Sequence, residues 1–177
     1  MQIIIPTPVI KMCSFKHTGL SGVGGGSTTA NTFMKRPLSA TYFETSEPSS
    51  TVFSLDDAND EIDILEAGMY YIYCETFAFS GGRFYSALRA MNGPTTRVLG
   101  SSNAGSTTSN VSSTITGFFK VTPTAIGTSG ASFAIYTKTV NSRATDGLGT
   151  PFSLDSEIET YATGYIQKIR NLIPSEE

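Results

Sequence analysis

The sequence predicts an all-β protein, a two-sheet antiparallel jelly-roll sandwich. Charged residues make up only 15% of the chain, and Ser, Thr and Gly supply much of what is not hydrophobic. That composition suits many short strands joined by turns. About eight segments alternate between apolar and polar residues with the period of a strand, and none shows the spacing of an amphipathic helix. At 177 residues, the chain is expected to form one domain with a substantial core.

Residues 69–79 form the predicted strand around which the fold is organised, because both of its faces are suited to burial. A short alternating segment leads into it through a turn at Glu66-Ala67-Gly68. Small and mid-sized side chains form one face, as expected inside a sandwich: Tyr70, Ile72, Cys74, Thr76 and Ala78. Large, mostly apolar side chains form the other face: Met69, Tyr71, Tyr73, Glu75, Phe77 and Phe79. A single small domain normally covers one face of an antiparallel sheet, so a partner subunit is expected on the second face.

Further strands are expected on both sides of this element. They fall at residues 32–43, anchored by Phe33 and Leu38, and at 51–55, 83–91, 114–121, 131–140 and 158–169. A hairpin turn at residues 80–82 is expected to join the organising strand to the next one. In the last strand, the pattern points Ala162, Gly164 and Ile166 inward and Tyr165 toward the partner. The stretches 101–114 and 141–156, rich in Ser, Thr and Gly, are expected to be exposed loops.

The first 23 residues are expected to form an extended arm ahead of the domain. Pro6 and Pro8 argue against a helix and a central strand there. The segment is nevertheless strongly apolar, at Ile3, Ile4, Ile5, Val9 and Ile10. Two interpretations stay open, an edge strand packed on its own domain or an arm that pairs with a neighbour, and the glycines of 22–26 permit both. The predicted organisation is an arm over 1–23, a jelly-roll domain over 24–173 and a tail over 174–177.

One segment resembles the core strand of tumour-necrosis-factor-like and complement-globular-head jelly rolls: Gly68-Met69-Tyr70-Tyr71-Ile72-Tyr73-Cys74-Glu75. Those proteins are trimers, and alternate residues of this strand line their threefold axis. The chain resembles more closely a group of bacteriophage virion proteins with the same jelly roll, over roughly residues 24–170. The shared pattern comprises Gly25-Gly26-Ser27, Phe33, Arg36-Pro37-Leu38, Ala67-Gly68-Met69-Tyr70, Leu88, Asn92-Gly93, Gly100-Ser101-Ser102, Gly117-Phe118-Phe119 and Tyr165-Ile166-Gln167-Lys168-Ile169. Two positions depart from it, Pro37 at a usually polar position and Glu75 where relatives are mostly uncharged.

The resemblance implies a homotrimer whose interface is formed by Met69, Tyr71, Tyr73, Glu75, Phe77 and Tyr165. It also implies a structural virion protein made in the host cytoplasm, specifically a trimeric decoration or cement protein that stabilises a phage head. The arm would then contact the major capsid protein or neighbouring virion proteins through Ile3, Ile4, Ile5, Val9 and Ile10. The alternative is a receptor-binding or adhesion module of a short head or tail fibre, whose loops 101–114 and 141–156 contact polysaccharide. One jelly roll serves many purposes, so the fold alone does not decide between the two.

The sequence offers no catalytic constellation, and we expect no enzyme activity, cofactor or metal. His17 is the single histidine; it follows Cys13 with no third or fourth zinc ligand nearby, and is expected to be solvated. The acidic run 56–61 could ligate calcium, but it lacks the glycine of an EF-hand loop and is expected to form a turn stabilised by Asx side chains. Cys13 and Cys74 are expected to be free thiols.

Charge and hydropathy argue against two classes of partner. The net charge is −3 and no run of Lys and Arg is longer than a pair, so no nucleic-acid surface is expected. No stretch approaches the roughly 20 apolar residues that span a membrane, and the N-terminal residues lack the basic region of a signal peptide.

Overall fold

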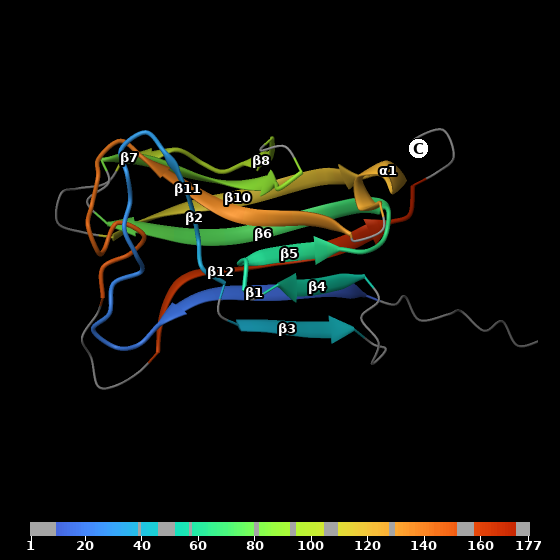
Figure 1. The fold of residues 1–177 in the computed structure, drawn as a ribbon, viewed down its shortest axis with the longest axis horizontal. Coiled ribbons are helices and arrows are strands. Elements are labelled where there is room, and N and C mark those ends of the chain that lie inside the picture. Colours follow the sequence, from blue (N-terminus) through green and yellow to red (C-terminus); the bar gives the residue numbers. More distant parts are fainter. Residues whose placement is uncertain are drawn as a thin grey trace, which may run out of the picture.

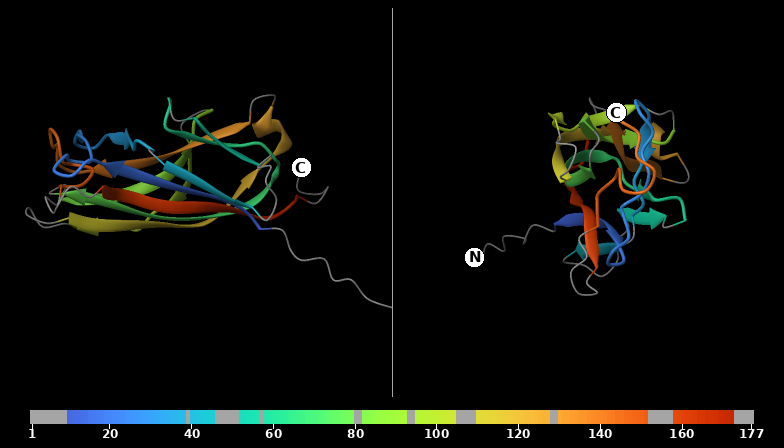
Figure 2. Two further views of the ribbon diagram at one scale, coloured as in Figure 1. Left: turned by 90° about the horizontal axis from the view of Figure 1, so that it is seen from below. Right: turned by 90° about the vertical axis from the view of Figure 1, so that its left-hand side faces the viewer.

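Two antiparallel β-sheets pack face to face in the computed structural model, which confirms the predicted jelly-roll sandwich (Figure 1). The structure describes residues 10–38, 40–45, 52–56, 58–79, 82–92, 95–104, 110–127, 130–151 and 158–172. Among these residues are twelve strands and one short helix. Two further views show the layers and the strands running along the long axis of the molecule (Figure 2).

The first sheet has five strands in the order β10-β6-β12-β1-β3. They are β10 (Asn110–Val121), β6 (Gly68–Phe79), β12 (Glu159–Arg170), β1 (Lys11–Gly19) and β3 (Ala40–Thr45). Every neighbouring pair is antiparallel, and β6 pairs with β10 over its whole length. Strand β6 is the organising strand that the sequence predicts, and it lies inside the sheet with a partner on each side.

The second sheet has seven strands, five of them in the order β4-β5-β11-β7-β8. They are β4 (Phe53–Asp56), β5 (Glu61–Ile64), β11 (Ala131–Thr139), β7 (Arg83–Ala90) and β8 (Thr96–Leu99). In addition, β2 (Phe33–Lys35) pairs with β11, and β9 (Asn103–Ala104) pairs with β7. The helix α1 (Pro123–Ile126) was not expected from the sequence, because a single turn is too short to show a helical period.

The core lies between the two sheets and follows the alternation seen in the sequence. All five small and mid-sized side chains of β6 are buried, as predicted. The second sheet faces them with branched and aromatic side chains, including Ile62, Ile64, Leu88, Phe133 and Ile135. Ala162, Gly164 and Ile166 of β12 are also buried, as predicted. The register of β6 therefore fixes which side chains remain on the outer face of the first sheet.

Strand β1 favours the first of the two interpretations left open for the N-terminal segment, because residues 11–19 pack in the domain's own sheet, although as an inner strand between β12 and β3 and not at an edge. Cys13, Phe15 and His17 alternate along β1 and are buried. The two prolines precede this strand, so they do not interrupt its ladder. Ile10 is exposed, and the other predicted arm contacts, Ile3, Ile4, Ile5 and Val9, lie outside the described residues.

Other predicted boundaries also need correction. The connection after β6 is not a hairpin, because β6 and β7 belong to different sheets. The predicted strand 32–43 is divided between β2 and β3, also in different sheets, and Pro37 lies at the division, where it cannot donate to a ladder. Leu38 is in the core, as predicted, but Phe33 is only half-buried. Strand β10 begins inside the predicted loop 101–114.

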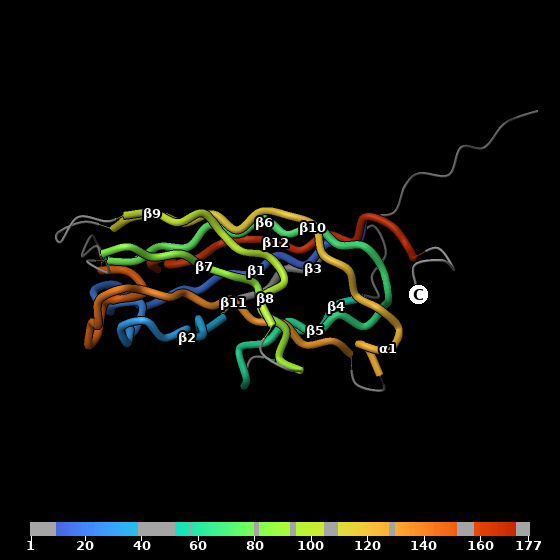
Figure 3. The backbone as a smooth tube through the Cα atoms, turned by 90° about the horizontal axis from the view of Figure 1, so that it is seen from above, coloured from blue at the N-terminus to red at the C-terminus, as the bar shows by residue number. Residues whose placement is uncertain are grey.

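Residues 141–151 are bound to residues 24–31 instead of forming a free loop. The Gly25 amide donates to the Gly149 carbonyl at 2.9 Å, and Leu148 donates to the Gly26 carbonyl at 3.1 Å. A β-carbon at Gly25 would lie 2.9 Å from the Leu148 carbonyl oxygen, so a glycine is required for this close approach. These segments share the end of the sandwich opposite to α1 (Figure 3).

Candidate functional site

The outer face of the five-stranded sheet carries a contiguous group of aromatic rings, Tyr71, Tyr73, Phe118 and Tyr165, which we call the aromatic face. Tyr73 and Tyr165 are direct partners in the β6–β12 ladder, and their rings stack with centroids 5.9 Å apart. Tyr71 and Phe118 are partners in the β6–β10 ladder, with centroids 5.2 Å apart. Tyr71 also lies 6.2 Å from Tyr165, which joins the two pairs. Three adjacent strands thus form one aromatic surface.

The aromatic face is open to solvent in the single chain. Phe118 is 65% exposed and Tyr73 is 36% exposed. Soluble proteins rarely leave connected large apolar side chains in water unless they form an interaction surface. Tyr71 has a polar partner, since its hydroxyl lies 2.8 Å from the Thr116 hydroxyl. The arrangement therefore matches the amphipathic aromatic composition of protein interfaces.

A hollow of about 330 Å³ extends the aromatic face toward β1. It is lined by Ser14, Phe15, Lys16, Tyr73, Thr163, Gly164 and Tyr165. Its wall therefore comes from β6, β12 and β1, and includes the stacked tyrosine pair. A depression beside exposed rings can receive a side chain from a second subunit.

All six residues predicted for the interface lie on this outer face. Met69, Glu75 and Phe77 are half-buried on the same side of β6 as Tyr71 and Tyr73. Phe118 was not predicted as an interface residue, although the alternation in Gly117-Phe118-Phe119 could have found it, because Phe119 is buried in the core. The threefold arrangement of these residues is not tested by a single chain and stays a prediction.

Glu75 lies between two uncharged ladder partners, Thr114 of β10 and Thr163 of β12. The sequence alone would allow Arg83 or Arg89, if on a neighbouring strand, to pair with Glu75. The structure does not, because both arginines belong to β7 in the other sheet, where Arg89 lies over the Phe33 ring. The carboxylate therefore stands on the aromatic face without a charged partner in either adjacent strand.

Arg36 forms a buried polar cluster in the core that the sequence does not predict. This side chain is fully buried, although arginine is rarely so. Its Nε donates to the Thr137 hydroxyl at 2.7 Å, and Nη1 donates to the carbonyls of Leu148 and Tyr161 at 3.0 and 3.1 Å. Nη2 donates to the Phe77 carbonyl. Arg36 therefore connects both sheets with the 141–151 segment.

His17 contacts this arginine and is not the solvated residue that the sequence analysis expected. Its Nδ1 lies 3.5 Å from Nη1 of Arg36, and its ring packs 5.3 Å from the Tyr161 ring. Burial, together with the Arg36 charge, lowers the pKa of His17 to about 3. The imidazole is therefore neutral at neutral pH.

The cysteines and the acidic turn behave as expected. Cys13 and Cys74 are free thiols, and burial raises the pKa of each to about 12. Asp56 accepts hydrogen bonds from the backbone amides of Ala58 and Asn59, both at 3.1 Å, which is the predicted Asx turn. Within the described ranges, no group of three or more His, Cys, Asp or Glu side chains is placed to hold a metal ion.

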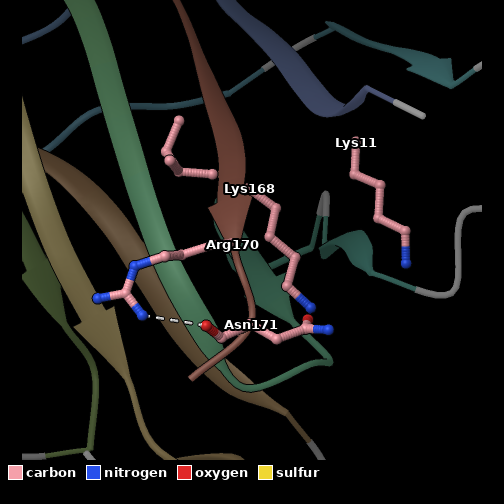
Figure 4. Close-up of a pocket in the computed structure, with 5 residues that line it drawn as sticks. Lys11, Lys168, Arg170 and Asn171 are labelled. Carbon is pink, nitrogen blue, oxygen red and sulfur yellow. Dashed lines mark hydrogen bonds between the residues drawn. The ribbon is translucent and has the colours of Figure 1, made fainter. Parts of the chain in front are cut away.

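A third group of charges lies at the end of the sandwich that carries α1. Glu66 accepts hydrogen bonds from Lys11 at 3.2 Å and from Lys168 at 2.5 Å. Burial raises the pKa of Glu66, but the hydrogen bonds from the two lysines outweigh it and hold the pKa below its ordinary value. Beside them is a hollow of about 210 Å³, at whose edge Arg170 donates to the Asn171 carbonyl (Figure 4). The lysines are thus neutralised within the chain, and the group ties β1 and β12 to the turn before β6.

Neither a protein-family model nor a curated protein sequence matches this chain. Several solved structures do match in fold. Eiger TNF from S. frugiperda has 12% identity and a TM-score of 0.59, and the match covers 96% of this chain and 99% of that one. Murine APRIL at pH 8.0 has 10% identity and a TM-score of 0.50, covering 90% and 99% of the two chains. The fold is a tumour-necrosis-factor-like jelly roll. Murine APRIL at pH 5.0 agrees, with 11% identity, a TM-score of 0.50 and the same coverage.

Identities this low establish the architecture and leave function to the residues of this chain. In the described part of the chain, no helix is both long and apolar enough to cross a membrane.

Proposed function

We propose that the protein is a structural virion protein, a homotrimeric decoration or cement protein of a phage head. The observation that carries the proposal is the aromatic face, a partly exposed set of rings on β10, β6 and β12 of the five-stranded sheet. Burying half of one such ring against a neighbour gives roughly 2–3 kcal/mol before the entropy of association is charged. Several rings in each of three chains supply enough for a stable assembly.

The threefold arrangement is supported by the fold and by the position of the aromatic face. In the trimeric jelly rolls whose core strand Gly68–Glu75 resembles, alternate residues of that strand line the shared axis, which supports the same arrangement for β6. In this chain those residues are Met69, Tyr71, Tyr73, Glu75 and Phe77, all on the outer face. The hollow beside Tyr73 gives a neighbouring chain a place to insert a side chain.

The role on a phage head is supported by the resemblance to bacteriophage virion proteins over most of the domain. The alternative role, a receptor-binding module of a short fibre, is favoured by a second cavity on the opposite sheet, lined by Tyr85, Arg83 and Lys138. A trimer leaves that sheet exposed, so both roles use the same assembly.

Two measurements test the proposal in separate steps. Light scattering of the purified chain gives its mass in solution, and a mass of one chain would overturn the trimer. Antibody labelling of virions in electron micrographs then locates the protein. Labelling over the head surface is expected, labelling only at a fibre or tail tip would favour the receptor-binding alternative, and unlabelled virions would overturn both roles.

A further inference from the structure

The outer face of the seven-stranded sheet carries a cavity of about 250 Å³, on the side of the molecule opposite to the aromatic face. It lies where β7 begins and β11 ends, and is lined by Asn31, Arg83, Tyr85, Ser102, Lys138, Thr139 and Val140. The volume is below the roughly 300–1,000 Å³ typical of sites for drug-sized ligands. A single six-membered ring with its substituents is therefore a better match than an extended ligand.

Two cations define the charge of the cavity. Arg83 is exposed at the start of β7, and Lys138 lies opposite Tyr85 in the β7–β11 ladder. The ion pairs within the described residues involve other cations, so neither Arg83 nor Lys138 meets a carboxylate there. The lysines beside Glu66 are different, because that carboxylate already binds both. A carboxylate from outside the chain can therefore bind at this cavity, and the arginine fork matches its geometry.

The aromatic wall of the cavity is held in place from behind. The Tyr85 ring packs edge-on against Phe33, with centroids 5.7 Å apart and planes at 82°. Phe33 is fixed in turn by the Arg89 guanidinium, whose carbon lies 4.3 Å from the ring centroid, and by Tyr136 at 6.3 Å. Tyr85 is half-buried, so part of its ring faces the cavity. Because the Tyr85 ring is already fixed by its neighbours, it loses little conformational entropy when the apolar C–H surface of a ligand packs on it.

Polar groups complete the lining. Asn31 and Ser102 bring an amide and a hydroxyl, which can donate and accept hydrogen bonds, whereas the Thr139 hydroxyl is buried and donates to the Asn141 carbonyl at 2.7 Å. Asn31 has φ 58°, in the left-handed region that Asn tolerates better than most residues, and its backbone amide is fixed by the Thr139 carbonyl at 2.8 Å. The turn that carries Asn31 to the cavity is thus tied to the end of β11.

We propose that this cavity binds one carboxylate-bearing sugar residue, a uronic or sialic acid, of a surface polysaccharide. Arg83 and Lys138 bind the carboxylate, the Tyr85 ring packs against the C–H face of the sugar, and Asn31 and Ser102 bind its hydroxyls. The sequence predicts sugar contacts in the loops 101–114 and 141–156, where aromatic residues are scarce, whereas the structure supplies the ring from β7. This inference does not depend on the head or fibre location.

The first test compares matched sugars by NMR titration of the purified wild-type chain. Methyl glucuronide and methyl glucoside differ in that only the glucuronide carries a carboxylate. A methyl sialoside tests whether the carboxylate-bearing sugar is a sialic acid instead of a uronic acid. Binding of at least one acidic sugar is expected, with methyl glucoside weaker by about tenfold or more. Equal binding of glucuronide and glucoside, or no binding of either acidic sugar, overturns the proposal. If free acetate binds as tightly as the acidic sugar, the Tyr85 ring contributes nothing to binding and its proposed role is overturned.

The second test uses variants with a matched control. Arg83→Gln is expected to weaken glucuronide binding about tenfold and leave the weak glucoside binding unchanged, since Arg83 is exposed and its loss does not unfold the chain. Arg97→Gln removes an exposed cation of β8 that does not line the cavity, and is expected to have no effect. If both variants weaken binding equally, the effect is general charge attraction and the site is wrong. Tyr85→Leu should weaken both sugars if the ring is the packing surface.

Discussion

Nη1 of Arg36 and Nδ1 of His17 lie 3.5 Å apart in a core that holds no carboxylate partner for the arginine among the described residues. Arginine can only donate hydrogen bonds, so Nδ1 must be the unprotonated nitrogen and the imidazole proton must be on Nε2. Protonating His17 would place two positive charges side by side in a buried position. The neutral histidine is therefore part of what allows Arg36 to be buried.

This contact predicts that acid destabilises the fold through His17. Its pKa is about 3 in the folded chain against an ordinary 6.5, so between these values the unfolded chain binds a proton that the folded chain does not. The stabilising contribution is complete above pH 6.5 and is lost as the pH falls, by about 1.4 kcal/mol per pH unit. The melting temperature of the wild type should already drop between pH 6.5 and 5.

The matched variant is His17→Phe, which keeps a ring beside Tyr161. Its melting temperature should be flat over the same interval, whatever its absolute stability. Asp56, Glu66 and Asp146 also have lowered pKa values, but their ordinary values of 3.8 to 4.5 put their contribution at lower pH. An unchanged slope in the variant would assign the acid sensitivity to another group.

Arg36 itself is expected to be one of the most sensitive positions in the chain. Arg36→Met leaves three carbonyls without this donor, those of Phe77, Leu148 and Tyr161. Each buried acceptor without a donor costs about 1–3 kcal/mol, so the free energy of unfolding should fall by roughly 3 kcal/mol or more. Arg36→Lys should recover little, because an ammonium cannot reproduce the fork.

Chemical denaturation measures the loss, and hydrogen exchange locates it. The amide of Leu148, bonded to the Gly26 carbonyl, should exchange faster in Arg36→Met than the amides of β10. The control is Arg97→Met, an exposed arginine of β8. A loss of stability as small as that of the control would show that the carbonyls find other donors.

The sequence predicts β6 and the fold well because both faces of that strand can be read from one run of alternating residues. It could not predict the environment of Arg36, since a charged residue is normally exposed and the carbonyls it binds belong to residues 41 to 125 positions away. It also left residues 11–19 open between a strand of the domain and an arm, because a histidine and a cysteine occupy inward positions of β1 and weaken the apolar alternation. Long-range backbone contacts leave no pattern in a single sequence.

The proposed assembly predicts that Phe118→Asp separates the subunits. A carboxylate at the most exposed ring of the aromatic face would be buried without a partner in the assembly, which costs several kcal/mol. Tyr73→Asp should act in the same way. Leu99→Asp, a 59% exposed position on the other sheet, is the matched control and should keep the wild-type mass. Light scattering of a trimeric Phe118→Asp would place the interface elsewhere.

Truncation separates the N-terminal segment from the domain. Deleting residues 2–9 leaves every strand of the described residues in the chain, and should leave a folded assembly that no longer binds particles if the segment is an anchor. Deleting residues 2–20 removes β1 from between β12 and β3, together with the buried Cys13 and Phe15, and should unfold the domain. Circular dichroism distinguishes the two, and a folded 2–20 deletion would show that β1 is dispensable.

Glu75 provides a prediction about contacts between subunits. Its ladder partners, Thr114 and Thr163, carry no charge, so three copies of Glu75 near a shared axis would repel one another. Glu75→Gln should therefore raise the melting temperature of the assembly, and more so at low salt. If a cation bridges the carboxylates instead, the substitution should lower the melting temperature and a chelator should destabilise the wild type alone.

The control is the same substitution in the separated Phe118→Asp chain. There the carboxylates are on different molecules in solution, so Glu75→Gln should leave the melting temperature unchanged. An equal effect in both backgrounds would mean that Glu75 acts within its own sheet, by a change in strand packing between Thr114 and Thr163. No effect in either background, with or without chelator, would place Glu75 in solvent, away from the other subunits. The difference between the two backgrounds is thus the coupling between subunits at this position.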